Sequence, residues 1–205
     1  MDSDILLDVA ILPPAELRRK IGGKIKEGVG RYPHLLVVDD TRLIPHLSLW
    51  HVRTSQNRIS KLVKDLEQAI KNQRPIRVRS AGFVAVKPEG CIEFRVKNSR
   101  ALTSLQQRIF KKTYPFKTGM MPQYGASFGM KWSREELREA EKYSRPLWFG
   151  PHFTAGILKS GKDALRAVEA MKEVRFSFLA KEIYVCRVNR LWQVTRIMRK
   201  ISFGG

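Results

Sequence analysis

The chain has 205 residues, of which 43% are hydrophobic and 28% charged, the composition of an ordinary soluble globular domain. No apolar run approaches the roughly 18–20 residues that span a bilayer, and the acidic start Met-Asp-Ser-Asp is unlike a basic presequence. We therefore expect a cytoplasmic protein without a membrane partner. Lys and Arg total 39 against 19 Asp and Glu, a formal net charge of +20. This surplus favours a polyanionic partner, nucleic acid before an acidic membrane surface, although charge also serves solubility.

The first half of the chain alternates short apolar runs with amphipathic stretches. Apolar runs bounded by Pro or Asp predict strands, and apolar residues at helical spacing predict helices. In chain order these are a strand at 5–12, a helix at 15–25, strands at 35–38 and 46–52, and a helix at 55–72. Two strands at 76–86 and 91–96 follow, and the Pro88-Glu89-Gly90 turn between them predicts a hairpin.

The second half begins with a helix at 99–112 and then loses its periodicity over 113–132, where glycines stand among aromatic residues. A capping box, Ser133 with Glu136, predicts a short charged helix to about residue 143. The chain ends with a strand at 152–158, a helix after Ser160 and strands near 182–188 and 192–201. Hairpin-paired strands with single inserted helices are typical of an antiparallel α+β protein. We expect one domain over 1–205, with 113–150 as an irregular insertion or lid.

Two triplets of the same kind open two of the predicted strands. His46-Leu-Ser48 follows Pro45, and His152-Phe-Thr154 follows Pro151. Because side chains alternate along a strand, each triplet presents an imidazole and a hydroxyl on one face. Imidazole titrates near neutrality, so one histidine can act as a base and the other as an acid. The hydroxyls can donate to the non-bridging oxygens of a phosphate, and such a phosphodiester reaction requires no metal.

The other histidines and cysteines have weaker claims on a site. By alternation His51 is predicted to point away from His46, and His34 has no matching motif. No Cys or His pair has metal-ligand spacing, so neither a metal nor another cofactor is expected. Cys91 and Cys186 lie within strand-like runs and are expected to be reduced, mostly buried thiols.

With its two motifs, the opening strand and helix, the hairpin and the closing strands, the chain resembles the 2H phosphoesterase superfamily. The nearest branch is that of RNA 2′,3′-cyclic phosphodiesterases, also called 2′-5′ RNA ligases. The resemblance implies a bilobed α+β fold with pseudo-twofold symmetry, in which antiparallel sheets line a central groove and helices lie outside. It implies catalysis by His46 and His152 and phosphate binding by Ser48 and Thr154. Both histidines are expected to lie in a wet groove. Ser48 stands where Thr is commoner, and Ala155-Gly156 replaces bulkier residues.

The expected reaction is metal-independent hydrolysis of one of two substrates: RNA that ends in a 2′,3′-cyclic phosphate, or 2′-5′-linked ribonucleotides. No preference for DNA is expected. Two alternatives remain: an RNA-binding module of the same fold without significant turnover, and a hydrolase of small cyclic oligonucleotide signals. Four further residues are candidates for contacts with the substrate: Trp50, Arg42, Tyr124 and Trp132. By alternation Trp50 is predicted to share a strand face with His46 and Ser48, and it is equally well explained as a core residue. The sequence does not say which histidine is the acid, nor how many chains associate.

Overall fold

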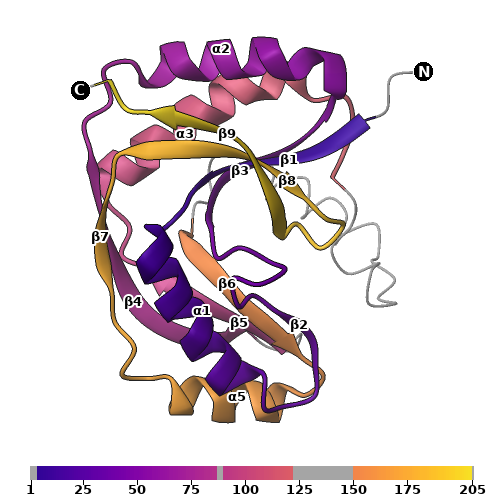
Figure 1. Ribbon diagram of the computed structural model, residues 1–205, viewed down its shortest axis with the longest axis vertical. Helices are drawn as coiled ribbons and strands as arrows, with labels where there is room; N and C mark the ends of the chain where they lie inside the picture. The colour runs from indigo at the N-terminus through magenta and orange to yellow at the C-terminus, as the bar shows by residue number, and fades with distance from the viewer. Residues whose placement is uncertain (1–3, 87–89, 122–149, 205) are drawn as a thin grey trace.

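A single, strongly curled antiparallel sheet of nine strands forms the centre of the computed structural model, which describes residues 4–86, 90–121 and 150–204. Eight strands are ordered β7-β4-β5-β6-β3-β1-β8-β9 across the sheet, and β2 pairs with β6 (Figure 1). The strands are β1 (Asp4–Ile11), β2 (His34–Val37), β3 (Leu47–Ser55), β4 (Ile76–Val86), β5 (Cys91–Val96), β6 (His152–Leu158), β7 (Ser177–Ala180), β8 (Glu182–Val188) and β9 (Val194–Ser202).

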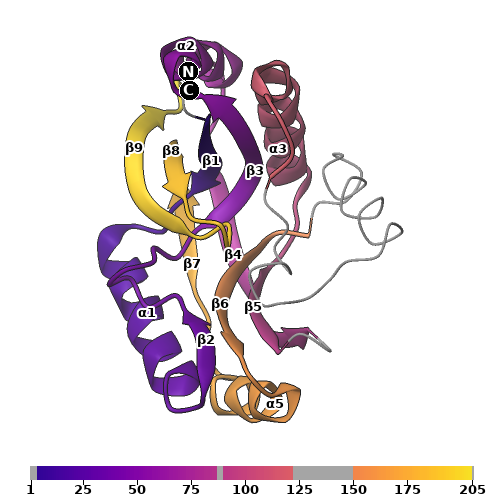
Figure 2. The same ribbon diagram turned by 90° about the vertical axis from the view of Figure 1, so that its right-hand side faces the viewer.

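The strand order is symmetric about its middle. Four strands from β9 to β3 make one half, and four from β6 to β7 make the other (Figure 2). The halves meet where β3 pairs with β6, with Leu47 opposite Phe153. The expected pseudo-twofold α+β architecture is confirmed in this form, as one curled sheet shared by both halves.

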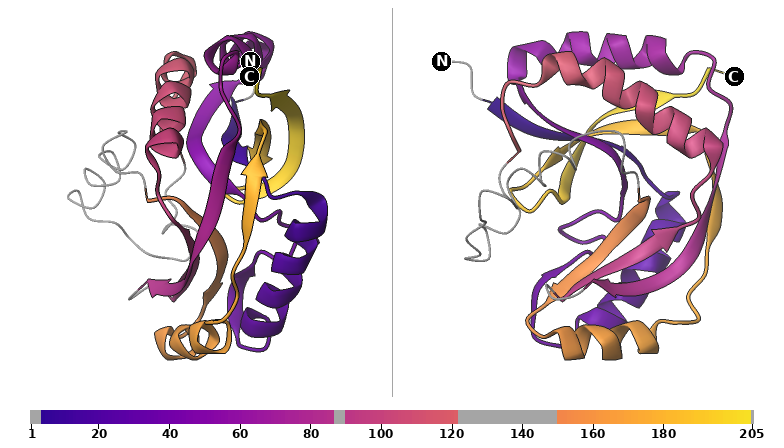
Figure 3. Two further views of the ribbon diagram at one scale, coloured as in Figure 1. Left: turned by 90° about the vertical axis from the view of Figure 1, so that its left-hand side faces the viewer. Right: turned by 180° about the vertical axis from the view of Figure 1, so that it is seen from behind.

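Helices pack in pairs at the two ends of the molecule, and the described residues contain four α-helices. One pair is α2 (Ile59–Ile70) with α3 (Arg100–Thr113), and the other is α1 (Ala15–Val29) with α5 (Gly161–Ala170) (Figure 3). Two helices begin at serines with local capping bonds. Ser99 Oγ accepts from the Leu102 N–H, and Ser160 Oγ accepts from the Asp163 N–H, each cap worth ~1 kcal/mol.

The core follows from the apolar runs of the sequence. Between Leu7 and Ile11 every residue of β1 is buried, and one of them, Asp8, is a carboxylate. In the other half, the rings of Phe83 and Phe94 stack at a centroid distance of 4.0 Å. Such close-packed interiors hold their neighbours in defined positions, so the strands at the centre form a rigid support.

Most predicted elements are confirmed, with shifted ends. Helix α1 continues to Val29, and a 3-10 turn at Gln56–Arg58 precedes α2. Strand β7 was not predicted. The predicted helix at 133–143 lies outside the described residues, and the assignment of 113–150 as a lid stays a prediction. Within the described part of the chain, no helix combines the length and the apolar character needed to cross a membrane.

Candidate active site

The two His-x-Ser/Thr motifs meet at the junction of the two halves. Since Leu47 pairs with Phe153 in antiparallel register, extending that register by one residue sets His46 opposite Thr154 and Ser48 opposite His152. In this extended register each hydroxyl falls across from the imidazole of the other motif, and His46 is near enough to His152 for their charges to interact. The tertiary structure brings together the four residues that the sequence motifs single out.

A bulge follows the hydroxyl residue in both motif strands. On β3, Ser48 pairs with Ala10 and Trp50 with Val9, so Leu49 has no partner on β1. On β6, Thr154 pairs with Glu93 and Gly156 with Ile92, which leaves Ala155 unpaired on β5. A bulge bends its strand and redirects the side chains beyond it. The same irregularity at the same place in both halves supports the internal symmetry.

Both motif histidines are held through the same ring nitrogen. Nδ1 of His46 donates to the Ile44 carbonyl at 2.7 Å, and Nδ1 of His152 donates to the Gly150 carbonyl at 2.8 Å. This bond fixes the tautomer and leaves Nε2 as the atom that can exchange a proton with a substrate. The exposed His34 makes the same bond, to the Tyr32 carbonyl at 2.8 Å. The bond is therefore a local property of Pro-His before a strand, and only its combination with the hydroxyls distinguishes the motifs.

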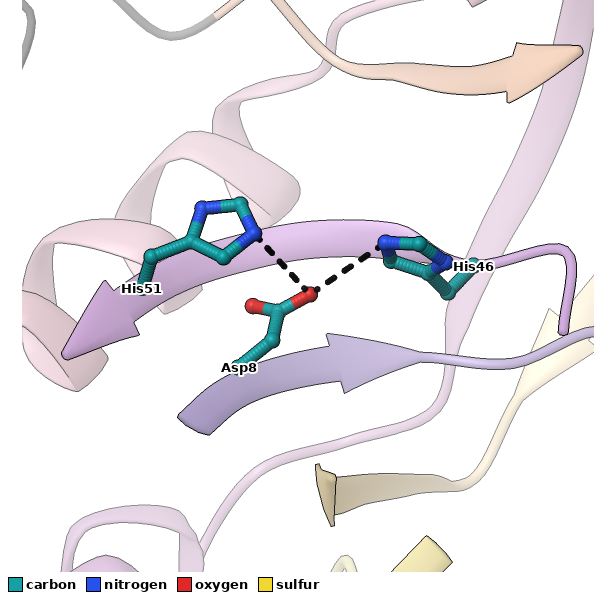
Figure 4. A group of neighbouring side chains, drawn as sticks. All are labelled: Asp8, His46 and His51. Atoms are coloured by element: carbon teal, nitrogen blue, oxygen red, sulfur yellow. Dashed lines mark ion pairs between the residues drawn. The ribbon is translucent and has the colours of Figure 1, made fainter. Parts of the chain in front are cut away.

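The first motif surrounds a buried carboxylate that sequence reasoning missed. Ser48 Oγ donates to Asp8 Oδ2 at 2.8 Å, and the Nε2 atom of His46 lies 3.6 Å from the same oxygen. Nε2 of His51 lies 3.7 Å from it on the other side (Figure 4). The one signal that could have found Asp8 was a charged residue inside the apolar run of 5–12.

His51 corrects the prediction from alternation. The bulge at Leu49 shifts the alternation of β3 by one residue, so His51 pairs with Asp8 and shares the face of Ser48. Trp50 pairs with Val9 on the opposite face, where its ring meets Phe110 edge-on at a centroid distance of 4.5 Å. The prediction that Trp50 shares a face with the motif is therefore wrong, because strict alternation holds only in an unbulged strand.

Burial controls the protonation of this cluster. Desolvation raises the pKa of Asp8 from 3.8 to about 6, against the opposing effects of His46 and the Ser48 hydrogen bond. Desolvation also lowers the pKa of His46, although Asp8 partly restores it. The pKa of His51 falls from 6.5 to about 4 for the same reason. At neutral pH the two imidazoles are therefore neutral beside a largely ionised Asp8.

The second motif has a different electrostatic environment. Nε2 of His152 lies 3.7 Å from Glu93 Oε1, and Arg95 Nε donates to Glu93 Oε2 at 2.8 Å. The side chain of His152 is 39% exposed, compared with 3% for His46. Both histidines were expected to lie in a wet groove, and this is wrong for His46. Asp8 and the residues packed on it exclude water from the first motif.

Other predicted contacts are spread over the chain. Arg42 is exposed in the loop before β3, while Tyr124 and Trp132 lie outside the described residues. Two hollows of the surface lie elsewhere, one beside α1 and α5 and the other between α2 and β9, and no motif residue lines either of them.

The sequence of the chain matches no family model and no curated protein. Solved structures match it over nearly its whole length. E. coli LigT complexed with NADP+ has a TM-score of 0.58 at 15% identity, covering 99% of this chain and 100% of that one. TT0787 of Thermus thermophilus has a TM-score of 0.62 at 16% identity, covering 98% and 99%. A structure described as a phosphoesterase has a TM-score of 0.58 at 16% identity, covering 99% and 100%. From end to end, the chain has the fold of E. coli LigT.

Proposed function

We propose that the chain is a metal-independent phosphodiesterase of 2′,3′-cyclic phosphate RNA ends or 2′-5′-linked ribonucleotides. The observation that carries the proposal is the meeting of two His-x-Ser/Thr motifs across the β3–β6 junction. Each motif supplies one imidazole whose Nε2 can move a proton and one hydroxyl suited to a phosphate oxygen. Opening a cyclic phosphate with water needs one proton removed and one delivered, which two such imidazoles can provide.

We assign the base to His46 and the acid to His152 in the hydrolytic direction. Burial lowers the pKa of His46, so its imidazole is neutral at physiological pH and can accept a proton from water. His152 is more exposed, so its Nε2 atom, 3.7 Å from Glu93 Oε1, is the one left to deliver a proton to the leaving oxygen. Substrate binding must open access to the Nε2 atom of His46, because that side chain is 3% exposed.

The hydroxyls of Ser48 and Thr154 are proposed to hold the phosphate. In the ligand-free arrangement the Ser48 proton is donated to Asp8, so Ser48 must turn to donate to a phosphate oxygen. A serine hydroxyl has one donor and a rotatable C–O bond, which makes this change inexpensive. Thr154 lies opposite His46 in the extended register and would bind the phosphate from the other half.

The structural relatives support a nucleotide-sized substrate. E. coli LigT has been crystallised with NADP+, with 3′-AMP and with ATP. For this chain we propose RNA ends as the natural partner, because the net charge of +20 favours a long polyanion. A hydrolase of small cyclic oligonucleotides would use the same two histidines, and a pure RNA-binding module would need neither.

One assay separates these functions. The protein is incubated, with and without EDTA, with RNA ending in a 2′,3′-cyclic phosphate, with 2′-5′-linked dinucleotides and with cyclic mononucleotides. We expect hydrolysis of the RNA end that EDTA does not reduce. Loss of activity with EDTA that added metal restores would contradict metal-independent catalysis. RNA binding without turnover of any substrate would identify a binding module.

A further inference from the structure

The carboxylate of Asp8 is poorly compensated for a buried ion. Its exposed fraction is 0%, and its hydrogen bonds come from the hydroxyl of Ser48, bonded to Oδ2, and from the backbone of Trp50. Oδ1 is buried without a hydrogen-bond partner among the residues that the structure describes. An ionised carboxylate taken out of water costs several kcal/mol unless a cation or several donors compensate it. The carboxylate therefore keeps an oxygen without a hydrogen bond, Oδ1, beside the Oδ2 atom that the two imidazoles face.

Two imidazole nitrogens face the same carboxylate. Nε2 of His46 and Nε2 of His51 lie 3.6 and 3.7 Å from Asp8 Oδ2 (Figure 4), and the ligand atoms of the three residues all lie within 4.8 Å of one another. A tetrahedral Zn²⁺ with bonds of 2.0–2.1 Å has neighbouring ligand atoms about 3.3 Å apart. The two Oδ2–Nε2 distances exceed this spacing by only a few tenths of an ångström, and side-chain rotation would bring the three atoms, which lie within 4.8 Å of one another, around a common centre.

Both imidazoles are already oriented as metal ligands usually are. Nδ1 of His46 donates to the Ile44 carbonyl, and the His51 ring is hydrogen-bonded to the backbone of Trp192. Trp192 has a positive φ of 58° and places its indole 5.3 Å from the His51 ring. A backbone carbonyl on the second nitrogen fixes the tautomer and ring orientation of a ligating histidine. A strained backbone at this point indicates that the surroundings enforce the position of His51.

We propose that Asp8, His46 and His51 form a site for a divalent transition-metal ion of the Zn²⁺ class, and that this ion inhibits the enzyme. Two nitrogens and one carboxylate oxygen suit Zn²⁺ and its neighbours in the first transition series rather than Mg²⁺ or Ca²⁺. The inhibitory part rests on the proposed function, because it follows from the use of the same His46 Nε2 atom for proton transfer. A nitrogen bound to metal cannot accept a proton, so metal binding and turnover exclude each other.

In the described part of the chain, the second half of the molecule has no such cluster. By register, the Asp8–His51 pair corresponds to Cys91 and Ile157 on β5 and β6. The nearest acidic residue of the second half, Glu93, corresponds to Ala10 and not to Asp8. The carboxylate of Glu93 accepts a hydrogen bond from Arg95. Among the residues that the structure describes, only the first half combines two imidazoles with such a carboxylate. The site arises where the internal symmetry is broken, because Asp8 and His51 have no counterparts of their kind in the second half.

Metal binding is tested on the whole protein after treatment with EDTA and desalting. Co²⁺ is titrated in while its visible absorption is followed, and Zn²⁺ affinity is measured by competition with a chromophoric chelator. His51→Phe keeps an aromatic ring beside Trp192 and removes the ligand, and His51→Gln is a second replacement. His34→Gln is the matched control, because His34 makes the same bond to a backbone carbonyl but is exposed.

We expect one tightly bound ion in the wild type and in His34→Gln, with the absorption of a four- or five-coordinate Co²⁺ site. Both His51 variants should weaken Zn²⁺ binding by at least about 100-fold, since even losing an outer partner of a ligand costs 10- to 100-fold. Circular dichroism identifies any variant that fails to fold. No bound ion in the wild type, or equal affinity in folded His51→Phe, would overturn the site.

Inhibition is measured separately. Zn²⁺ should abolish hydrolysis of the active substrate at the concentration that saturates the chelator competition, and EDTA should restore the rate fully. Full turnover by protein with a saturated metal site would overturn inhibition while leaving the site intact. If no substrate is hydrolysed under any condition, the proposed function fails, whereas the Co²⁺ and Zn²⁺ titrations still decide the metal site.

Discussion

Asp8 and His51 are cross-strand partners on β1 and β3, and the Nε2 atom of His51 lies 3.7 Å from the Asp8 carboxylate. The pairing exists because one extra residue, Leu49, interrupts the register between Ser48 and Trp50. Strict alternation would point His51 away from His46. The bulge instead turns the His51 side chain toward the motif. The protonation of the buried cluster and the proposed metal site both involve this pair.

Replacing either motif histidine should remove most of the activity. His46→Ala and His152→Ala should each lower kcat by about 10²–10⁴, the usual worth of a positioned acid or base. His34→Ala is the control and should retain the wild-type rate. His46→Gln is measured as well, since His46 is buried and its truncation leaves a cavity. Near wild-type turnover by a folded variant of either residue would disprove the two-histidine mechanism.

The hydroxyls should matter less than the histidines. Thr154→Val should lower kcat by up to about 10²–10³, the loss seen when one donor is removed from an oxyanion site. Ser48→Ala should lower kcat similarly, and Ser48→Thr should be nearly neutral because the donor is kept. Steady-state kinetics with the same substrate measure all three. An inactive Ser48→Thr enzyme beside an active Ser48→Ala enzyme would show that packing, and not donation, governs position 48.

The buried cluster should give opposite pH dependences in two variants. Burial raises the pKa of Asp8 to about 6, so native Asp8 takes up a proton at higher pH than unfolded Asp8. The titration of Asp8 therefore raises the free energy of unfolding as the pH falls from about 6 to 4. Burial lowers the pKa of His51 to about 4, so the unfolded state takes up that proton first, and acid disfavours folding from about pH 6.5 downward. Each effect amounts to at most ~3 kcal/mol.

In the wild type the two effects largely cancel. Relative to it, Asp8→Asn should lose free energy of unfolding on going from about pH 7 to 4.5, and His51→Phe should gain it. Urea denaturation in EDTA at both pH values measures this difference. Parallel pH dependences of the two variants would contradict the assigned pKa directions.

Salt dependence should distinguish long RNA from a small nucleotide as substrate. Each neutralised phosphate of a single strand contributes a slope of about −0.7 to the dependence of log affinity on log salt. With four to six contacts, RNA affinity should fall roughly 50- to 350-fold between about 50 and 200 mM salt. A cyclic mononucleotide with one contact should lose about threefold. Binding of an RNA oligomer is measured beside mononucleotide hydrolysis, and equal shallow slopes would remove the case for an RNA-binding surface.

The motifs and most elements could be predicted because they depend on local patterns. Period-two and helical spacing mark the strands and helices, and Pro-His followed by a hydroxyl marks the starts of β3 and β6. Strand β7 was missed because only four residues, Ser177–Ala180, carry its pattern.

The sequence by itself determined the α+β class, the two motifs and the histidines that they contain. Only the tertiary structure decided that Asp8 and His51 belong to the same site, that His46 is buried while His152 is exposed, and that Glu93 lies beside His152. The reason is physical. A bulge reverses the alternation of a strand by one residue, and its position is set by pairing with a neighbour distant in the chain. Burial and pKa depend in the same way on side chains from several strands, and no local pattern encodes them.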